Sequence, residues 1–208
     1  MKRKYVTLGV AILVMLGMIG CLEIPLGDPE TSKVDDQYVG LWLNNSTPND
    51  ESEMLTVMPF DARTYLITQL RFVKTDAGYQ SRGQSNMKGW LTKIGDTTFI
   101  TAEGKDPKSL VESADKIWFV AKIQRTGEQV TIQQVDGKFV KESNIATPDA
   151  LAKFITDNLK NPKLYEEDTG TYTRLGPGDS EKAKGILSAF SEPKQQSAST
   201  DPNNGVGL

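Results

Sequence analysis

Apolar and polar residues alternate along short segments between Tyr38 and Val140, and turn residues separate these segments. Alternation of this kind, in place of solid apolar runs, is typical of antiparallel strands that bury one face. Residues 116–124 show it most clearly, because Ile117 and Phe119 fall on one face while Trp118 and Val120 fall on the other. The pattern predicts eight strands in succession, at residues 38–43, 54–60, 64–74, 86–94, 97–102, 116–124, 129–135 and 138–140.

The connections between these strands decide the architecture. The gaps are too short to hold crossover helices, which excludes a parallel sheet, and Gly95-Asp96 is typical of a tight hairpin. A chain of hairpins with one apolar face must close on itself or pack face to face to protect its edges. We therefore predict a mainly β fold, an antiparallel up-and-down meander of about eight strands that closes as a barrel.

One amphipathic helix is expected after the meander. Thr147 is a suitable N-cap and Pro148 suits the first helical position. An apolar stripe at helical spacing follows, and Asn161-Pro162 prevents continuation of the helix. We interpret the helix as packing that covers one side or end of the barrel, and residues 171–175 as a final short strand. The stripe consists of Leu151, Phe154, Ile155 and Leu159.

Composition divides the chain into four parts. Residues 1–20 have the features of a signal peptide, and residues 21–37 contain prolines, glycines and charges without apolar periodicity, as in a tether. Residues 38–175 form the predicted domain. Residues 176–208 are rich in small and polar residues, which favours a flexible, disordered tail, although residues 179–190 are compatible with a short helix.

The first residues have the three-part layout of a secretory signal. Three basic residues follow Met1, an apolar run extends from Tyr5 to Ile19, and Gly20 precedes Cys21, the only cysteine. The run is about fifteen residues long, whereas a membrane-spanning helix needs roughly 20, and a core helix does not usually begin with three cations. A spanning anchor and the start of a soluble fold are the less favoured interpretations.

The segment Met18-Ile19-Gly20-Cys21 resembles the lipobox of bacterial lipoproteins, which the lipoprotein signal peptidase recognises. This resemblance implies that the thiol of Cys21 receives a diacylglycerol and that its freed amine takes a further acyl chain such as palmitate. More than one chain suffices for stable membrane attachment. Leu22 and Glu23 lack the aspartate that retains such proteins in the inner membrane, so the resemblance implies the outer membrane of the cell envelope, facing the periplasm.

The order of strands, helix and last strand is similar to that of the lipocalins and related calycin barrels. Gly40-Leu41-Trp42 stands in the place of the family's Gly-x-Trp motif, and Arg174 stands where an arginine could pack over that tryptophan. The resemblance implies a lipocalin-like barrel. Residues 87–100 and 151–175 also resemble uncharacterised bacterial lipoproteins, which implies no activity.

Charge and residue types exclude several functions. Without residues 1–20 the chain has 21 basic and 27 acidic residues, a net charge of −6, which disfavours binding to nucleic acid. The chain has no histidine, which excludes Ser-His-Asp and Cys-His catalysis and histidine-based zinc sites, and Cys21 is no nucleophile once acylated. No Gly-rich phosphate loop appears. We therefore expect no enzyme, no metal and no cofactor.

The acidic residues fall into three clusters, which we interpret as solvated charge in loops and at strand ends rather than a catalytic carboxylate pair or a calcium site. They are Asp35-Asp36, Asp50-Glu51-Glu53 and Glu166-Glu167-Asp168.

Two functions remain ahead of an enzyme. The first is a binding module for a small apolar ligand, and the alternative is a structural protein in an envelope assembly, with another envelope protein as its partner. An eight-stranded barrel either fills with side chains or holds one small ligand, and the sequence leaves this choice open. The large aromatic residues are interpreted as plain core. They are Trp42, Phe72, Trp90, Phe99 and Phe119.

Overall fold

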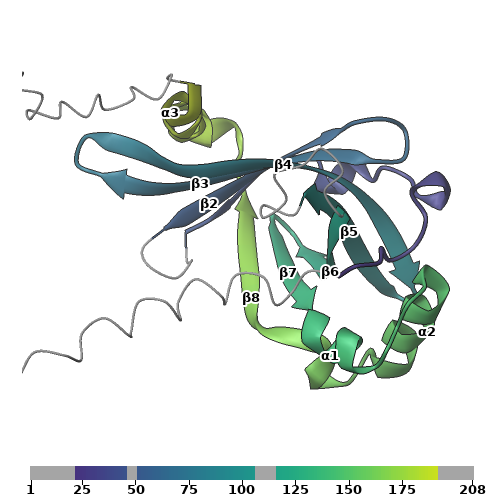
Figure 1. Ribbon diagram of the computed structural model, residues 1–208. Helices are drawn as coiled ribbons and strands as arrows, with labels where there is room; N and C mark the ends of the chain where they lie inside the picture. The colour runs from purple at the N-terminus through teal and green to yellow at the C-terminus, as the bar shows by residue number, and fades with distance from the viewer. Residues whose placement is uncertain (1–21, 46–50, 106–115, 192–208) are drawn as a thin grey trace, which may run out of the picture.

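The computed structural model describes residues 22–45, 51–105 and 116–191, and within them eight antiparallel strands form a closed barrel in chain order (Figure 1). The predicted fold class, an up-and-down lipocalin-like barrel, is confirmed. The strands are β1 (Gly40–Asn44), β2 (Ser52–Pro59), β3 (Tyr65–Thr75), β4 (Gly78–Ile94), β5 (Thr97–Lys105), β6 (Lys116–Thr126), β7 (Gln129–Val135) and β8 (Tyr165–Arg174).

The first and last strands close the barrel. β1 pairs with β2 along its whole length and with β8 through Trp42 opposite Arg174 and Leu43 opposite Thr173. Closure gives each of the eight described strands two neighbours, so none of them is an edge strand over its whole length. It also brings the Gly-x-Trp segment and Arg174, which are far apart in sequence, to the same end of the barrel.

The eighth strand of the barrel is the last predicted strand, expected at residues 171–175, which begins earlier, at Tyr165, and not the predicted strand at residues 138–140. Residues 138–140 lie in α1 (Gly137–Glu142), and the strand that closes the barrel follows the second helix. The side chain of Asp136 accepts hydrogen bonds from the backbone amides of Lys138 and Phe139 and so caps α1 at its N-terminus. Three alternating residues are too few to distinguish a strand from one turn of helix.

β3 and β4 form a long hairpin that projects from the barrel (Figure 1). β4 begins at Gly78, eight residues before the predicted start, and pairs with β3 up to Thr75. Residues 78–86 are almost entirely polar, so the sequence pattern does not mark them. Pairing with β3 holds them in a strand nonetheless.

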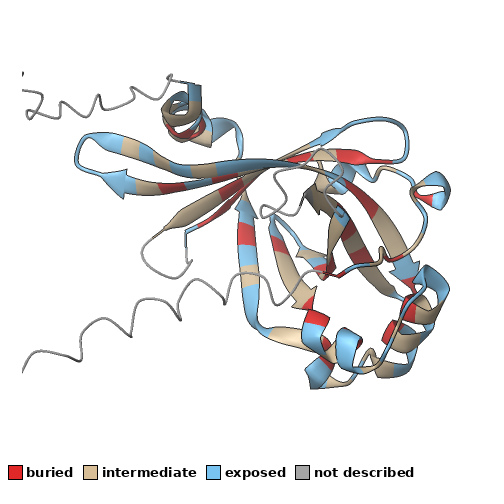
Figure 2. Ribbon diagram, viewed as in Figure 1, coloured by how far each residue is buried: buried red, intermediate tan, exposed pale blue. Residues whose placement is uncertain are grey.

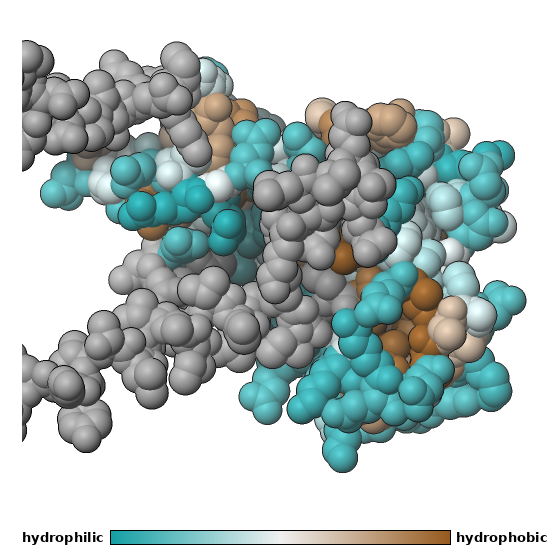
Figure 3. Space-filling view, in the orientation of Figure 1, coloured by the Kyte–Doolittle hydropathy of each residue, from teal (hydrophilic) through white to brown (hydrophobic). Residues whose placement is uncertain are grey.

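Helix α2 (Pro148–Asn158) covers one side of the barrel rather than an end. The hydroxyl of Thr147 accepts from the amide of Ala150, as expected of its N-cap. Leu151 and Ile155 are fully buried and join a cluster that includes Phe99 and Val120 from the outer face of the sheet. In the space-filling view, hydrophobic residues gather beside α1 and α2 (Figure 3).

The expected disorder of residues 176–208 is wrong for the part that the structure describes. Residues 177–191 form η6 (Pro177–Asp179) and α3 (Ser180–Ser191), on the opposite side of the barrel from α1 and α2 (Figures 1 and 2). Ile186 packs against an apolar patch on the outer face of β1, β2 and β3, formed by Leu43, Met54, Leu70 and Phe72. This patch gives a marginal helix a surface on which to fold. Residues 192–208 lie outside the described residues.

The expected tether is also wrong from Leu22 onward. Leu22 forms two backbone hydrogen bonds with Trp118, of 2.8 and 2.9 Å, and its side chain is buried. β6 runs past the last residue of β7, which leaves a free strand edge that Leu22 occupies. After η2 (Pro29–Thr31), η3 (Asp36–Tyr38) leads into β1.

Leu26 fixes the same segment more firmly. Its side chain is fully buried, and its carbonyl oxygen accepts hydrogen bonds from Trp90, Thr92 and Thr101. Gly27 follows with a φ of +71°, and a Cβ there would lie 2.2 Å from the Thr92 hydroxyl. Residues 22–27 are therefore part of the folded domain.

None of the described helices is both long enough and apolar enough to cross a membrane.

Candidate binding cavity

The inner faces of all eight strands enclose a cavity of about 350 Å³. Small-molecule sites usually measure about 300–1,000 Å³, so this volume lies at the lower end of that range. Most of the lining is apolar, with polar side chains gathered toward one end. The barrel is thus not filled by its own side chains, which answers the question that the sequence left open.

One end of the cavity is closed by η3, and Tyr38 of this turn is part of the lining. The indole N–H of Trp42 donates to the Tyr38 carbonyl at 2.8 Å, and Arg174 donates to the Val39 carbonyl at 2.7 Å. The guanidinium carbon of Arg174 lies 5.6 Å from the centre of the Trp42 ring, within cation–π range. The expected packing of Arg174 over Trp42 is confirmed.

Two further side chains hold this closed end. The Tyr65 hydroxyl accepts from the amide of Asp35 at 2.6 Å, and Arg125 donates to the Gln37 carbonyl at 3.1 Å. Burial is the main reason that the pKa of Tyr65 is raised to about 12, so its hydroxyl stays protonated at neutral pH. Four strands of the barrel therefore contribute side chains that hold η3.

The middle of the cavity is apolar. Leu55, Leu91, Ile100 and Phe119 line it, and Ala121 leaves space where a larger residue would fill the barrel.

The large aromatic residues that the sequence grouped as core divide between the two faces of the sheet. Trp42 and Phe119 line the cavity. Phe99 joins the cluster that α2 covers, and Phe72 joins the cluster that α3 covers. Trp90 donates its indole N–H to the Leu26 carbonyl. Only the inward-facing pair can therefore contact a molecule in the cavity.

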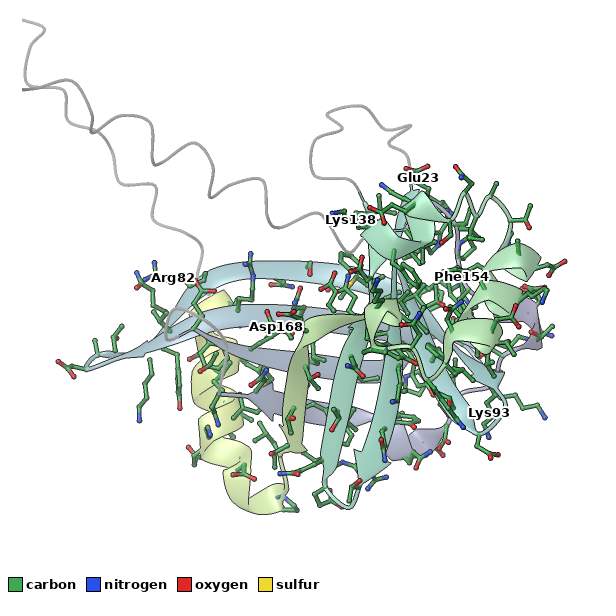
Figure 4. The ribbon with its side chains drawn as sticks, turned by 90° about the horizontal axis from the view of Figure 1, so that it is seen from below. Glu23, Arg82, Lys93, Lys138, Phe154 and Asp168 are labelled. Atoms are coloured by element: carbon green, nitrogen blue, oxygen red, sulfur yellow. The ribbon has the colours of Figure 1, made fainter. Side chains whose placement is uncertain are left out.

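Five polar residues line the other end of the cavity, and we call them the polar rim: Glu53, Gln69, Gln134, Glu166 and Asp168. Glu53 is near the start of β2, Gln134 near the end of β7, and Glu166 and Asp168 near the start of β8, all at the end of the barrel away from η3. Figure 4 shows Asp168 on β8, between the hairpin with Arg82 and the region of Lys138.

Burial and nearby carboxylates change the acidity of the rim and its neighbour Tyr172. The Tyr172 hydroxyl donates to Glu53 at 2.8 Å, and burial together with the charge of Glu53 raises the pKa of Tyr172. Burial is also the main reason that the pKa of Glu166 is raised, and the charges of Asp136 and Asp168 raise it further. The rim is thus a place where negative charge is crowded.

Three of the acids that we interpreted as solvated charge at strand ends line the cavity: Asp168 is exposed, and Glu53 and Glu166 are half-buried. Their shared place in the cavity lining was not predicted. Period-two spacing was the missed signal: Glu53 shares a strand face with Leu55, and Glu166 and Asp168 share one with Tyr172. Of the remaining acids, Asp35 caps η3 by accepting from the Gln37 amide.

The predicted lipid-attachment and signal residues cannot be placed. Met18, Ile19, Gly20 and Cys21 lie outside the described residues, as does Asp50. Among the residues that are described, no group of three or more aspartate, glutamate, histidine or cysteine side chains is arranged to hold a metal ion.

Comparison of the chain with protein-family models, curated proteins and solved structures found no match.

Proposed function

We propose that the protein is a lipid-anchored lipoprotein of the bacterial cell envelope whose barrel is a non-catalytic binding module for a small apolar ligand. The observation that supports binding is the apolar cavity, closed by η3 and lined by inward-facing side chains of every strand. A ligand that buries about 300 Å² of apolar surface gains roughly 7 kcal/mol, from which the cost of association is subtracted.

Binding should be visible as a retained ligand. We expect residues 22–208, isolated without detergent, to carry a small apolar molecule in native mass spectrometry. Ala121→Trp places an indole in the cavity and should abolish this binding. Thr171→Trp makes a comparable change on an exposed, outward-facing position of β8 and should leave the ligand in place.

Unfolding of both variants by urea separates occlusion from misfolding, since overpacking usually costs about 1–3 kcal/mol. Absence of any bound or bindable apolar molecule in the folded wild-type domain contradicts the binding module. Retention of the ligand by a folded Ala121→Trp variant places it outside the cavity.

Membrane anchoring through Cys21 rests on the N-terminal sequence. The first described residue is the next one, Leu22, whose backbone is hydrogen-bonded to Trp118 of β6. Consecutive Cα atoms lie about 3.8 Å apart, so a lipid on residue 21 would attach directly beside the barrel wall. We propose the outer membrane, with the barrel facing the periplasm.

Cys21→Ser tests the anchor. The substitution removes the thiol that would carry the diacylglycerol, so the cell should accumulate unprocessed precursor that still contains residues 1–20. Intact mass and incorporation of labelled palmitate measure both effects, and Ser32→Ala, a change inside the folded domain, is the control for processing. A wild-type protein that is cleaved but carries no lipid refutes the anchor.

One observation favours the alternative of a structural partner in an envelope assembly. Met58, near the end of β2, and Phe60, in the turn that follows, are both exposed, Phe60 by 60%. Specific protein interfaces bury about 800 Å² on each partner, far more than two side chains provide. Isolation of a stable partner that is lost on Phe60→Ser would support this role.

A further inference from the structure

Every charged side chain in the cavity lining is a carboxylate. Glu53, Glu166 and Asp168 come from two strands, and among the described residues neither lysine nor arginine lines the cavity. An acidic lining does not suit a fatty acid, because the carboxylate of the ligand would be a fourth among the three of the lining. The negative charge of the lining therefore disfavours a ligand whose polar end is also negatively charged.

The geometry separates an apolar part from a charged part. The apolar side chains and η3 lie toward one end of the strands, and the three carboxylates lie toward the other. Glu166 and Asp168 are two residues apart on β8 and so share its inner face. A single-chain molecule bound with its tail toward Trp42 would place its other end among these carboxylates.

Two charged side chains lie near the rim without lining the cavity. Asp136 adds a further negative charge near Glu166. Arg71 lies on β3 opposite Glu53 in register, but it is exposed and is not part of the lining. Burial is the main reason that the pKa of Glu166 is raised, and the charges of Asp136 and Asp168 raise it further. A positive charge placed beside these carboxylates would favour their ionised form.

We propose that the cavity selects single-chain amphiphiles with a cationic amine end, which lies against Glu166 and Asp168, and disfavours those with a carboxylate end. This proposal rests on the proposed binding function and adds the chemical class of the ligand. An ammonium group donates up to three hydrogen bonds, which suits a rim made of carboxylate and amide oxygens. The volume of about 350 Å³ favours one chain over two.

Three probes of equal chain length measure the selectivity: dodecylamine, dodecanol and dodecanoate. Each is titrated into residues 22–208, a chain that contains every described residue of the core, at pH 7 and below its micelle-forming concentration. Binding is followed by isothermal calorimetry. We expect the amine to bind at least tenfold more tightly than dodecanoate, with the alcohol between them.

Variants of the rim locate the effect. The double variant Glu166→Gln and Asp168→Asn should bind dodecylamine about tenfold more weakly than the wild type. Its affinity for dodecanol should stay within twofold of the wild-type value. Glu167→Gln is the matched control, because Glu167 lies between them on β8 and is exposed on the outer face. It should leave all three affinities unchanged. Arg71→Gln should not weaken the binding of dodecylamine.

The outcomes separate this proposal from the binding function. If dodecanoate binds as tightly as dodecylamine, or if the double variant binds the amine unchanged, the cationic selectivity is wrong while the cavity remains a binding site. If none of the three probes binds the folded domain, the binding function itself fails.

Discussion

A chain that begins at Tyr38 should lose most of its stability, although the sequence marks that residue as the start of the domain. Truncation removes Leu22 and Leu26, and burial of each such side chain contributes about 1.5–3 kcal/mol. It also leaves the buried donors of Trp90 and Thr101 without the Leu26 carbonyl, at about 1–3 kcal/mol each. The loss, roughly 5–12 kcal/mol, is comparable to the whole stability of a typical domain.

Urea unfolding of residues 22–208 and 38–208 measures this effect. Leu26→Ala in the longer chain should cost about 2–5 kcal/mol. Lys33→Ala, an exposed position in the same segment, should change the free energy of unfolding by less than about 0.5 kcal/mol. Equal unfolding midpoints for the two chains would show that residues 22–37 do not support the barrel.

Trp42→Ala should have the second largest effect. The Trp42 side chain is 2% exposed, and its truncation removes a large inward-facing ring, the hydrogen bond to the Tyr38 carbonyl and the surface under Arg174. Truncation of a buried tryptophan costs about 3–5 kcal/mol. Because Trp42 holds η3, the closed end of the cavity should loosen and ligand retention should fall as well.

Two comparisons make this prediction specific. Trp42→Phe keeps a ring but loses the N–H donor, so we expect a loss of about 1–2 kcal/mol. Trp118→Ala removes the same side chain from a half-buried position on the outer face of β6, and should cost less than Trp42→Ala and leave binding intact. A double-mutant cycle of Trp42 and Arg174 measures their coupling. A coupling near zero contradicts the role assigned to the pair.

The barrel was predictable because alternation over five or more residues specifies a strand and its buried face. The same signal failed where it was short or absent. Residues 138–140 alternate over only three positions, and Asp136 then favours helix α1 by capping it. The polar residues of the projecting hairpin carry no apolar pattern, and only their pairing with β3 identifies them.

The misassigned ends of the domain have a different cause. Pro25, Gly27 and Pro29 have the composition of a linker, yet the segment is ordered because β6 extends past β7. The apolar stripe on α3 is weak, but α3 packs against the apolar patch on the outer face of β1, β2 and β3. Both surfaces exist only after the barrel has formed, so local sequence does not reveal them.

The candidate site was predictable only in part. The strand pattern assigns Trp42 and Phe119 to strands, but whether their inner face encloses space depends on the sizes of residues from every strand, Ala121 among them. Glu53, Glu166 and Asp168 were correctly recognised as charged strand ends. Their approach to one another follows from barrel closure, which places β2 and β8 on either side of β1.

The position of Leu26 also determines when the domain can be completed. Its carbonyl bonds to side chains 64 to 75 residues later in the chain, and such distant contacts form slowly because a long loop must first be closed. If the N-terminus is the first part to leave the cytoplasm, as a secretory signal implies, this segment emerges before any of its partners. We therefore expect it to dock as a late step, after β4, β5 and β6 have paired.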